Sequence, residues 1–380
     1  MSQSVSVRPV RGKEDLRVFL DVPFAIYADD PNWVAPLYVE RLEHLDPKRN
    51  PYFRHAEAEL FLAFRGDRPA GRISAQLCRL RSERHADGVG QFGFLEAEND
   101  PAVFAALFEA AGAWLKQRGA TAIQGPFSFS INDETGLLIE GFDTPPSVLM
   151  GHARPYYGQR IEEAGFAKAK DVIAYDLFAA PEIPRALKSA YDKALSDKDV
   201  TLRPLDKKQL LKELRTVVSI ANDAWSENWG FVPWTEEEMT ALANNLKFLV
   251  SGDYIAIAEY KGEPAAMAIT LPNINDWLTG LQGRLLPFGW AKIAWSLYAK
   301  PPQAVRMPLM GLRKKFHGTP AGAVLGMAVI ARVRNFHVGR GTMKGEASWI
   351  LEDNMPMRRM IEAFGGRPYK TYRIYEKLIG

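Results

Sequence analysis

The sequence has a single cysteine, Cys78, and six histidines that stand in no metal-binding pattern. One thiol excludes a disulfide framework and a cysteine-rich metal centre. No HExxH-type spacing brings two histidines onto one face of a helix. We therefore expect no metal ion and no permanently bound cofactor. Cys78 lies in the apolar segment Ile73–Leu80, which favours a buried thiol over a nucleophile.

Long apolar runs and a strong net charge are also missing. No stretch of about 18 apolar residues could form a membrane-spanning helix. The N-terminal residues lack the apolar core of a secretory signal. The net charge is only +3 over 380 residues, without a basic run, so nucleic acid is not expected as a partner. These absences favour a cytoplasmic globular protein long enough for two domains.

The chain repeats itself after about 195 to 200 residues. The paired segments are Val5–Val10 with Val200–Leu205, Asn32–Pro36 with Asn228–Pro233, Gly66–Ala70 with Gly262–Ala265, and Gly165, Lys170 and Tyr175 with Gly365, Lys370 and Tyr375. Four matches in one order indicate a domain duplication. We predict domains at 1–180 and 200–380, with a linker helix region at 181–199. The boundary is expected within Ala179–Pro184.

Both copies predict the same order of elements, an α/β unit in which a mixed, mostly antiparallel sheet is flanked by helices. The order is a strand, one or two helices, a hairpin, a strand, a helix, a strand, a short helix and a terminal strand. The hairpins turn at Gly66-Asp67 and Lys261-Gly262. The terminal strands are Asp171–Phe178 and Tyr369–Glu376, and each is expected to close its own copy.

In the second copy, the strand Ala304–Leu312 runs into the turn Arg313–Gly322 and then a helix. This turn resembles the Q/R-x-x-G-x-G/A motif of the Gcn5-related N-acetyltransferase (GNAT) family. In that family the backbone N–H groups of the turn hold the pyrophosphate of coenzyme A (CoA) at the helix start. His317 takes the first position and Gly322 the last. Pro320 replaces the middle glycine and removes one N–H, although proline suits a first helical turn. The alternative is an ordinary basic turn.

A second GNAT mark is an asparagine after the next strand, here Asn354. Many members place a general-acid tyrosine seven residues later, but this position is Ile361, so that acid is absent or comes from elsewhere. The resemblance also implies that backbone at Met310 and Gly311 holds the thioester oxygen. It thus implies acyl-CoA as co-substrate, bound by Met310, Gly311, Leu312, Arg313, Lys315, His317, Gly318, Thr319, Ala321, Gly322 and Asn354.

The strand Gly345–Leu351 carries an acid, Glu346, among apolar residues. A buried acid next to the expected thioester site is a candidate catalytic base. A salt bridge to Lys344 or Arg373 is the structural alternative. His317 and Tyr372 are further candidates, and the sequence does not decide between the three.

The first copy lacks such a turn, because Glu98–Pro101 leads directly into a helix and its acids would repel phosphates. It has instead the long loop Gly125–Gly151, which contains Asn132 and Asp133. Irregular loops of this length are usually functional, so we expect this loop to wall the acceptor site. The alternative is an idle loop on a degenerate scaffold.

The second copy carries an insertion, 275–300, rich in aromatic residues, with Trp277, Trp290 and Trp295 among scattered cations. This composition is typical of an interfacial helix on anionic lipid, and also of the wall of an acyl channel. A buried core helix is the alternative.

Across the whole chain, the two copies with the segments Ser348–Asn354 and Tyr369–Lys377 resemble a bacterial group of double GNAT-like proteins that includes the ceramide synthases. The resemblance implies an N-acyltransferase that moves a long-chain acyl group from acyl-CoA to a lipid-like amine, a sphingoid base. It also implies peripheral contact with the inner membrane surface. Two alternatives stay open. One is an aminoacyl transferase acting on a cell-wall precursor, which usually has a helical arm that is not evident here. The other is a non-catalytic acyl-CoA- or lipid-binding protein, favoured by Pro320 and Ile361.

Overall fold

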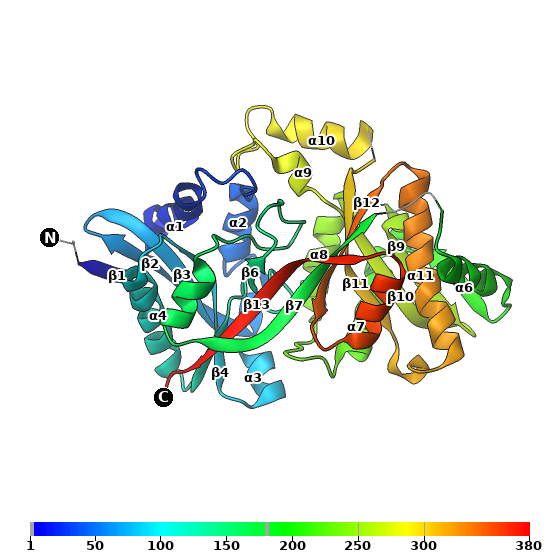
Figure 1. The fold of residues 1–380 in the computed structure, drawn as a ribbon, viewed down its shortest axis with the longest axis horizontal. Coiled ribbons are helices and arrows are strands. Elements are labelled where there is room, and N and C mark those ends of the chain that lie inside the picture. The colour runs from blue at the N-terminus through cyan, green and yellow to red at the C-terminus, as the bar shows by residue number, and fades with distance from the viewer. Residues whose placement is uncertain (1–3, 179–181, 250, 300) are drawn as a thin grey trace. The chain divides into compact units, whose positions relative to one another are not determined.

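The computed structural model describes residues 4–178, 182–249, 251–299 and 301–380 (Figure 1). The predicted boundary is Ala179–Pro184, and its residues 179–181 lie outside the described residues. The chain forms two compact units. The first comprises Met1–Ile173, Gly280–Arg284 and Lys370–Gly380, and the second comprises Ala174–Thr279 and Leu285–Tyr369.

The first unit contains a mixed sheet in the order β1-β2-β3-β4-β5-β13, with β6 also paired to β13. Among the described strand pairs of this sheet, β4 and β5 are the parallel pair, and the others are antiparallel. Its elements are β1 (Val5–Pro9), α1 (Gly12–Ile26), α2 (Tyr38–Leu45), η1 (Pro51–Arg54), β2 (Ala56–Arg65), β3 (Arg68–Cys78), α3 (Arg79–His85), β4 (Val89–Ala97), α4 (Pro101–Lys116), β5 (Ala122–Gly125), β6 (Leu137–Glu140), α5 (Tyr157–Glu163) and the start of β7 (Ala167–Phe178).

The second unit repeats this plan in the order β12-β11-β10-β9-β8, and here only β11 and β12 are parallel. Its elements are α6 (Arg185–Ser196), β8 (Val200–Pro204), η2 (Lys207–Gln209), α7 (Leu210–Trp225), α8 (Glu236–Leu249), η3 (Gly252–Tyr254), β9 (Ile255–Tyr260), β10 (Glu263–Pro272), α9 (Asn275–Leu278), α10 (Gly289–Ala299), β11 (Ala304–Leu312), η4 (Lys314–Phe316), α11 (Pro320–Gly339), β12 (Lys344–Leu351), α12 (Met355–Ala363) and the start of β13 (Arg367–Leu378). The predicted fold class, two α/β copies with mixed and mostly antiparallel sheets, is confirmed.

The terminal strands differ from the sequence expectation that each copy is closed by its own strand. The end of β13, drawn in red in Figure 1, belongs to the first unit and pairs antiparallel with β5, from Tyr375 opposite Gly125 to Leu378 opposite Ala122. Ala174–Phe178 of β7 belongs to the second unit, where β7 lies beside β12. The two strands carry similar alternation, and a pattern of period two specifies a face and not a partner.

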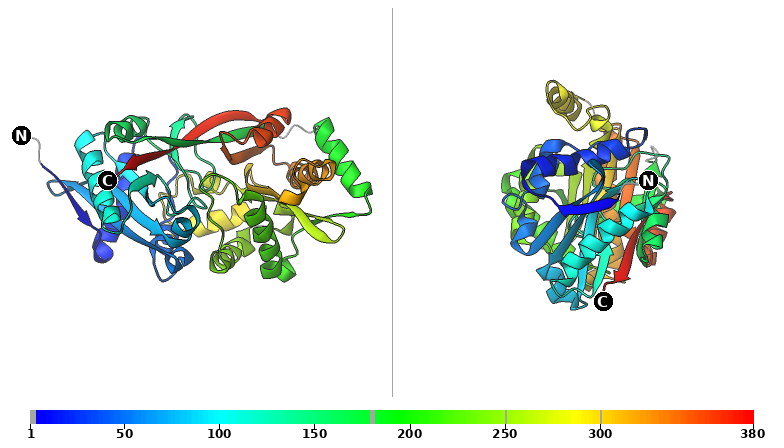
Figure 2. Two further views of the ribbon diagram at one scale, coloured as in Figure 1. Left: turned by 90° about the horizontal axis from the view of Figure 1, so that it is seen from below. Right: turned by 90° about the vertical axis from the view of Figure 1, so that its left-hand side faces the viewer.

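Alternation along the strands of the first unit separates two helical layers. On β3, the Arg72 side chain donates to the backbone oxygen of Phe19 in α1. A Cβ on the preceding residue, Gly71, would lie 3.0 Å from the side chain of Leu107 in α4. Successive residues of a strand point to opposite faces, so α1 and α4 cover opposite faces of this sheet (Figure 2).

The second unit uses the same rule with smaller residues on one side. Ile255 and Ile257 of β9 pack in the cluster formed by α7 and α8. Ala256 and Ala258, which alternate with them, pack against Leu325 and its neighbours on α11. Alanines on that face let α11 lie close to the sheet, so the start of α11 is held firmly at the end of β11.

Candidate functional site

Each unit has a split between its two parallel strands. In the second unit, β11 and β12 pair only from Ala304–Met307 to Lys344–Ala347. In the first unit, β4 and β5 pair only from Val89–Gln91 to Ala122–Gln124. Beyond these pairs the strands separate, so backbone and side chains at the ends of β4 and β11 have no parallel neighbour.

In the second unit, the turn between β11 and α11 has the shape of a helix-opening loop. Gly318 has a φ of 69°, a left-handed conformation that glycine adopts without strain. Thr319 is the N-cap of α11, and its hydroxyl accepts the N–H of Gly322 at 3.0 Å. Pro320 occupies the first helical position. A Cβ on Gly322 would come within 2.1 Å of the backbone oxygen of Phe316, so this position requires glycine.

The basic residues of this turn already have partners. Arg313 donates to the Pro264 backbone oxygen and to Ser219. Lys315 pairs with Glu263, and both side chains are more than half exposed, which makes this ion pair weak and easily exchanged. His317 is exposed, and its Nε2 lies 2.8 Å from the backbone oxygen of Leu312. Cationic charge therefore lines the turn without being buried.

The predicted thioester-binding residues lie on the part of β11 that has left β12. Met310 is opposite Ala268 of β10, and Gly311 is opposite Met267. The Met310 backbone oxygen accepts from the Trp225 indole at 3.3 Å. A Cβ on Gly311 would lie 3.2 Å from the Met267 side chain. Met310 and Gly311 lie beyond the last described pair of the ladder with β12, Met307 with Ala347.

Glu346 lies inside a buried polar cluster at the parallel pairing. Its carboxylate accepts hydrogen bonds from the hydroxyls of Ser348 and Tyr369, and Arg306 Nε lies 3.6 Å away. Arg306 and Glu346 are 3% and 5% exposed and are directly opposite each other in the ladder. The ion-pair partner is thus Arg306, and neither Lys344 nor Arg373, which the sequence analysis considered, takes that place.

The remaining predicted residues of this set are spread out. Tyr372 is fully buried and belongs to the first unit, whereas Glu346 and His317 belong to the second. Asn354 caps α12, because its side chain accepts the N–H of Met357 at 3.2 Å. The sequence analysis missed Arg306 and Tyr369. Arg306 could have been noticed in the sequence, because it is a charged residue within the otherwise apolar strand β11.

In the first unit, the loop between β4 and α4 is closed by carboxylates. Asp100 caps α4 by accepting the N–H of Ala102 at 2.9 Å and forms an ion pair with Arg65. Glu98 pairs with Arg68 at 2.8 Å. A side-chain anion therefore already lies at this helix start, where α11 of the second unit has the hydroxyl of Thr319.

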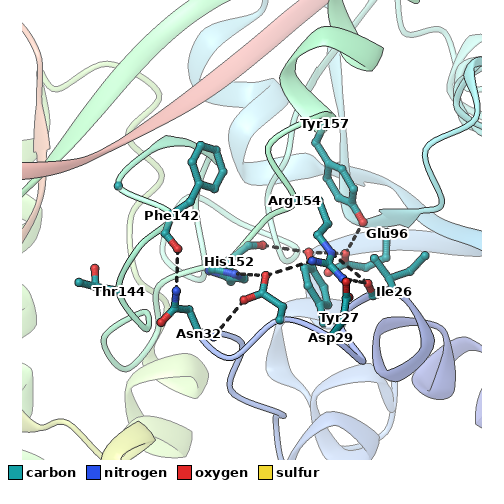
Figure 3. A network of polar contacts seen from close by, with 12 residues as sticks. Ile26, Tyr27, Asp29, Asn32, Glu96, Phe142, Thr144, His152, Arg154 and Tyr157 are labelled. Atoms are coloured by element: carbon teal, nitrogen blue, oxygen red, sulfur yellow. Dashed lines mark hydrogen bonds and ion pairs between the residues drawn. The ribbon is translucent and has the colours of Figure 1, made fainter.

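The first unit contains a network of buried polar groups around the end of β4 (Figure 3). Glu96 Oε2 accepts from the hydroxyls of Tyr27 at 2.7 Å and Tyr157 at 2.8 Å. The ring of His152 contacts Asp30 through Nε2 at 3.0 Å. Burial raises the pKa of Glu96, although the charge of Arg72 opposes this shift. Burial likewise lowers the pKa of His152, against the effect of Asp30. The sequence analysis named none of these residues, and only Glu96, an acid within an apolar strand, gave a signal.

The long loop of the first unit is ordered by its own side chains. Asp133 accepts from the backbone N–H and the hydroxyl of Ser130, both at 3.2 Å, and the Asn132 N–H donates to that hydroxyl at 3.0 Å. Arg41 of α2 pairs with Glu134 at 2.5 Å, and this pairing lowers the pKa of Glu134 against the effect of burial. The loop is thus held by its own hydrogen bonds and by the ion pair with α2, and its role as a wall of the acceptor site stays a prediction.

The insertion of the second unit exposes apolar side chains. Trp277 is 9% exposed and packs in the interior, whereas Trp290 and Trp295 are 58% and 71% exposed. Leu286 and Phe288 are each 78% exposed. We call these four exposed residues, Leu286, Phe288, Trp290 and Trp295, the apolar patch. No described helix is long and apolar enough to cross a bilayer, and no described group of acidic, histidine or cysteine side chains forms a metal site.

The fold is similar to that of solved structures of GCN5-related N-acetyltransferases, one of them a tandem GNAT protein. A tandem GNAT protein from the clavulanic acid biosynthesis pathway superposes with a TM-score of 0.61 at 13% identity, covering 99% of both chains. A GCN5-related glucosamine N-acetyltransferase region of a fungal β-N-acetylglucosaminidase gives 0.58 at 12% identity, covering 99% of this chain and 38% of that one. At such identities the likeness shows the fold alone, and that fold is the tandem GNAT fold.

Full-length sequence relatives define the family more closely. The bacterial ceramide synthase of Caulobacter vibrioides is 46% identical over 378 residues, which cover 99% of this chain and 98% of the relative. Protein YghO of Escherichia coli is 43% identical over 378 residues, 98% of this chain and 95% of the relative. No protein-family model matches the chain. The chain belongs to the family of the bacterial ceramide synthase.

Proposed function

We propose that this protein is an acyl-CoA-dependent N-acyltransferase that moves a long-chain acyl group onto the amine of a sphingoid base and so forms a ceramide. The observation that carries the proposal is the 46% identity to a bacterial ceramide synthase along nearly the full length of both chains. Such identity extends over both units and the insertion, and not only over the part that resembles a CoA site. This extent supports the same kind of acceptor for both proteins.

The CoA pyrophosphate is proposed to bind at His317–Gly322 in the second unit. The turn opens α11, and helix starts attract phosphate groups. Since Pro320 has no N–H and Thr319 takes the N–H of Gly322, the donors for the phosphates are Gly318, Ala321 and the exposed side chains of His317 and Lys315. The acidic helix start of the first unit is unsuited to an anion, so we assign one CoA site to the chain.

The reaction needs a base for the ammonium proton, donors for the oxyanion and a proton for the leaving thiolate. The free edge of β11 at Met310 and Gly311 supports the second role. For the first role we propose Glu346, as the base or as a carboxylate that binds the acceptor. Its three neighbours fix its orientation, and His317 and Tyr372 stay alternative candidates. The amine nitrogen attacks the thioester carbon, one proton goes to the base, and the second goes to the CoA sulfur.

Contact with lipid is proposed for the apolar patch, at the inner face of the membrane. Exposed tryptophans suit the headgroup level, and Lys292, also exposed, suits anionic lipid. Asn132 and Asp133 belong to the loop that we propose as a wall of the acceptor site. The protein would thus work from the cytoplasm on a substrate that resides in the bilayer.

The test is to incubate the purified protein with palmitoyl-CoA and sphinganine. We expect release of free CoA thiol together with N-palmitoylsphinganine, detected by mass spectrometry. N-acetylsphinganine, which has no free amine, is the matched acceptor control. Stabilisation of the protein by acyl-CoA without thiol release with any amine would instead support a non-catalytic binding protein. Transfer to a cell-wall peptide precursor, and not to sphinganine, would support the aminoacyl transferase alternative.

A further inference from the structure

The ladder between β10 and β11 fixes which way the backbone groups of β11 point beside the split. The N–H of Arg313 donates to the Ala265 backbone oxygen of β10 at 2.8 Å. Along an antiparallel pair, residues alternate between facing the partner strand and facing away from it. Gly311, two residues before Arg313 and opposite Met267, therefore also faces β10. The N–H and the oxygen of Met310 face the other way, toward the split.

Side chains are bonded to the backbone oxygens on this free edge. The indole N–H of Trp225 donates to the Met310 oxygen at 3.3 Å. His317 Nε2 lies 2.8 Å from the oxygen of Leu312, which faces the same way as Met310. Among the described residues, no acceptor is bonded to the N–H of Met310 or of Leu312. The edge therefore offers a ligand two open donors, whereas each of its acceptors already has a partner.

The first unit closes the corresponding edge of β4. The equivalent of Leu312, the last residue of β11, is Ala97, the last residue of β4. The Ala97 N–H donates to the Tyr157 hydroxyl at 3.0 Å, and the Ala97 oxygen accepts from the Tyr156 hydroxyl at 2.7 Å. At this residue the first unit thus has no donor left for a ligand, whereas the second unit leaves the N–H of Leu312 open.

The indole of Trp225 comes from the helix that packs against β11, α7 (Figure 1). Trp225 is the last residue of α7 and packs against the buried cluster of that helix. A Cβ on Gly311 would lie 3.5 Å from the side chain of Ala224, so the end of α7 lies directly against this part of the strand. Met310 is beyond the described ladder with β12, and the indole holds its oxygen in one place.

A carbonyl oxygen beside an open donor affects what that donor can bind. The N–H and the oxygen of Met310 face the same side, so a thioester oxygen bound to the N–H lies near the lone pairs of the Met310 oxygen. The thioester oxygen gains negative charge as the amine attacks, and the repulsion between the two oxygens increases. An indole can only donate. Its hydrogen bond draws negative charge from the Met310 oxygen and so reduces this repulsion.

We propose that Trp225 is a positioning residue for acyl transfer. By capping the Met310 oxygen, it leaves the Met310 N–H as the donor for the thioester oxygen. This inference rests on the proposed function, and it adds a residue of α7 to the site. It also distinguishes the two residues considered for this role, because Met310 turns its N–H toward the split and Gly311 turns its own toward β10.

Two variants of the full-length protein separate the indole N–H from the size of the ring. Trp225→Phe keeps a large aromatic ring and removes the donor. Trp225→His is smaller but keeps a donor, because histidine Nε2 occupies the same ring position as tryptophan Nε1. With palmitoyl-CoA and sphinganine at about pH 8, where imidazole is neutral, Trp225→Phe should lower kcat about tenfold, the effect of one lost hydrogen bond. Trp225→His should lower kcat less, and both should leave the KM for palmitoyl-CoA unchanged.

A role in packing alone predicts the opposite order, since phenylalanine fills the space of the indole better than histidine does. Higher kcat in Trp225→Phe than in Trp225→His would therefore overturn the inference. The matched control is Trp229→Phe, which removes an indole N–H that is bonded to no described residue, and it should leave kcat and KM unchanged. Urea unfolding of the three variants shows which loss of activity comes from loss of folded protein.

An infrared measurement tests the same contact without turnover. In the absence of an amine, bound palmitoyl-CoA labelled with a heavy isotope at the thioester carbon should absorb at a lower frequency in the wild type than in Trp225→Phe, because a hydrogen bond from Met310 weakens the thioester C=O bond. Trp229→Phe should match the wild type. An unchanged frequency and an unchanged kcat in Trp225→Phe would overturn the inference and leave the acyltransferase proposal standing. The predicted frequencies in a protein that acylates no amine would overturn the proposed function alone.

Discussion

The two units have different side chains at equivalent positions of their parallel strand pairs, β4–β5 in the first unit and β11–β12 in the second. Where the parallel strands pair, the first unit sets Gln91 opposite Gln124, and the second sets Arg306 opposite Glu346. The amide of Gln124 reaches Glu376 at 2.7 Å, whereas Arg306 and Glu346 form a buried ion pair. A neutral amide pair suffices to build this sheet. The charged pair in the second unit therefore points to chemistry and not to folding.

The same contrast recurs at two other places. The helix after the split is capped by the carboxylate of Asp100 in the first unit and by the hydroxyl of Thr319 in the second, and this difference supports the proposal of one CoA site. The third and fourth strands are joined by the short basic helix α3 in the first unit and by the apolar α9–α10 insertion in the second. The two units thus share the same strands and helices, and they differ in the helix caps, the ladder side chains and the connection between the third and fourth strands.

The largest effect is expected from breaking the buried ion pair one residue at a time. Arg306→Gln or Glu346→Gln leaves one buried charge without its partner, which costs roughly 3–5 kcal/mol of unfolding free energy. The double variant Arg306→Gln/Glu346→Gln recreates the amide pair of the first unit and should recover most of that stability. All three variants should lose acyl transfer. Urea unfolding of the wild type and the three variants, compared in a double-mutant cycle, gives the coupling free energy between Arg306 and Glu346.

Two results would contradict this view of the pair. A double variant as unstable as the sum of the two single variants would show that the charges are part of the fold. Full activity per folded molecule in Glu346→Gln would make Glu346 structural.

A second prediction concerns the buried histidine of the second unit. His337 is 4% exposed, its Nε2 contacts Thr270 at 2.8 Å, and burial lowers its pKa to about 4. Because the folded-state pKa lies below the unfolded value of about 6.5, its neutral form contributes stability that is complete above pH 6.5 and is lost as pH falls through 4. The loss amounts to about 3 kcal/mol.

His337→Gln, which keeps a donor for Thr270, should be less stable than the wild type at pH 7. Its unfolding free energy should also change less between pH 6.5 and pH 4. Urea unfolding at a series of pH values measures both curves. In the first unit, burial lowers the pKa of His152 but Asp30 opposes the shift, so His152→Gln should change the slope less. Equal slopes for both variants would contradict the contrast.

The third prediction separates the two helix starts. Gly322→Leu places atoms where the Phe316 backbone oxygen lies and should weaken CoA binding at least a hundredfold, or about 2.7 kcal/mol. Gly339→Ala, at the open far end of the same helix, is the control and should bind normally. Asp100→Ala should leave CoA affinity unchanged although it removes the cap of α4. Calorimetric titration with CoA measures all three, and equal losses from Asp100→Ala and Gly322→Leu would show that CoA does not distinguish the units.

Much of the fold was predictable because the sequence repeats the same pattern of elements in its two halves. The repeats and the alternation of period two predicted the order of elements along the chain and the two hairpins, and the resemblance to the GNAT turn predicted a helix that begins near Pro320. The exchange of β7 and β13 was not predictable, since alternation selects a face and leaves the neighbour open. Glu346 was noticed because an acid in an apolar strand is rare, but its partner Arg306 is 40 residues away and joins it only through the ladder. The network of Tyr27, Glu96 and His152 comes from three distant segments, and no local pattern in the sequence brings them together.

The smallest effect is expected at the insertion that only the second unit carries. Trp290→Glu with Trp295→Glu replaces two exposed aromatic side chains of the apolar patch by charges. Burial of apolar area in an interface is worth roughly 25 cal/mol per Å². Even partial burial of the two tryptophans should therefore increase the affinity for vesicles tenfold or more. We expect the variant to co-sediment with anionic vesicles about tenfold more weakly, and the wild type to bind more weakly at high salt.

The control is Leu195→Glu, a residue on α6 that is 60% exposed and lies outside the patch, and it should bind vesicles normally. Activity on sphinganine in vesicles should fall with the tryptophan variant, while activity on the soluble 2-amino-1,3-octanediol should persist. This difference between the two activities is expected because the insertion is proposed to bind the bilayer, whereas the proposed catalytic residues lie elsewhere in the chain. If the tryptophan variant binds vesicles and acylates sphinganine as the wild type does, the insertion has no role at the membrane, and the contrast between α3 and α10 is one of length alone.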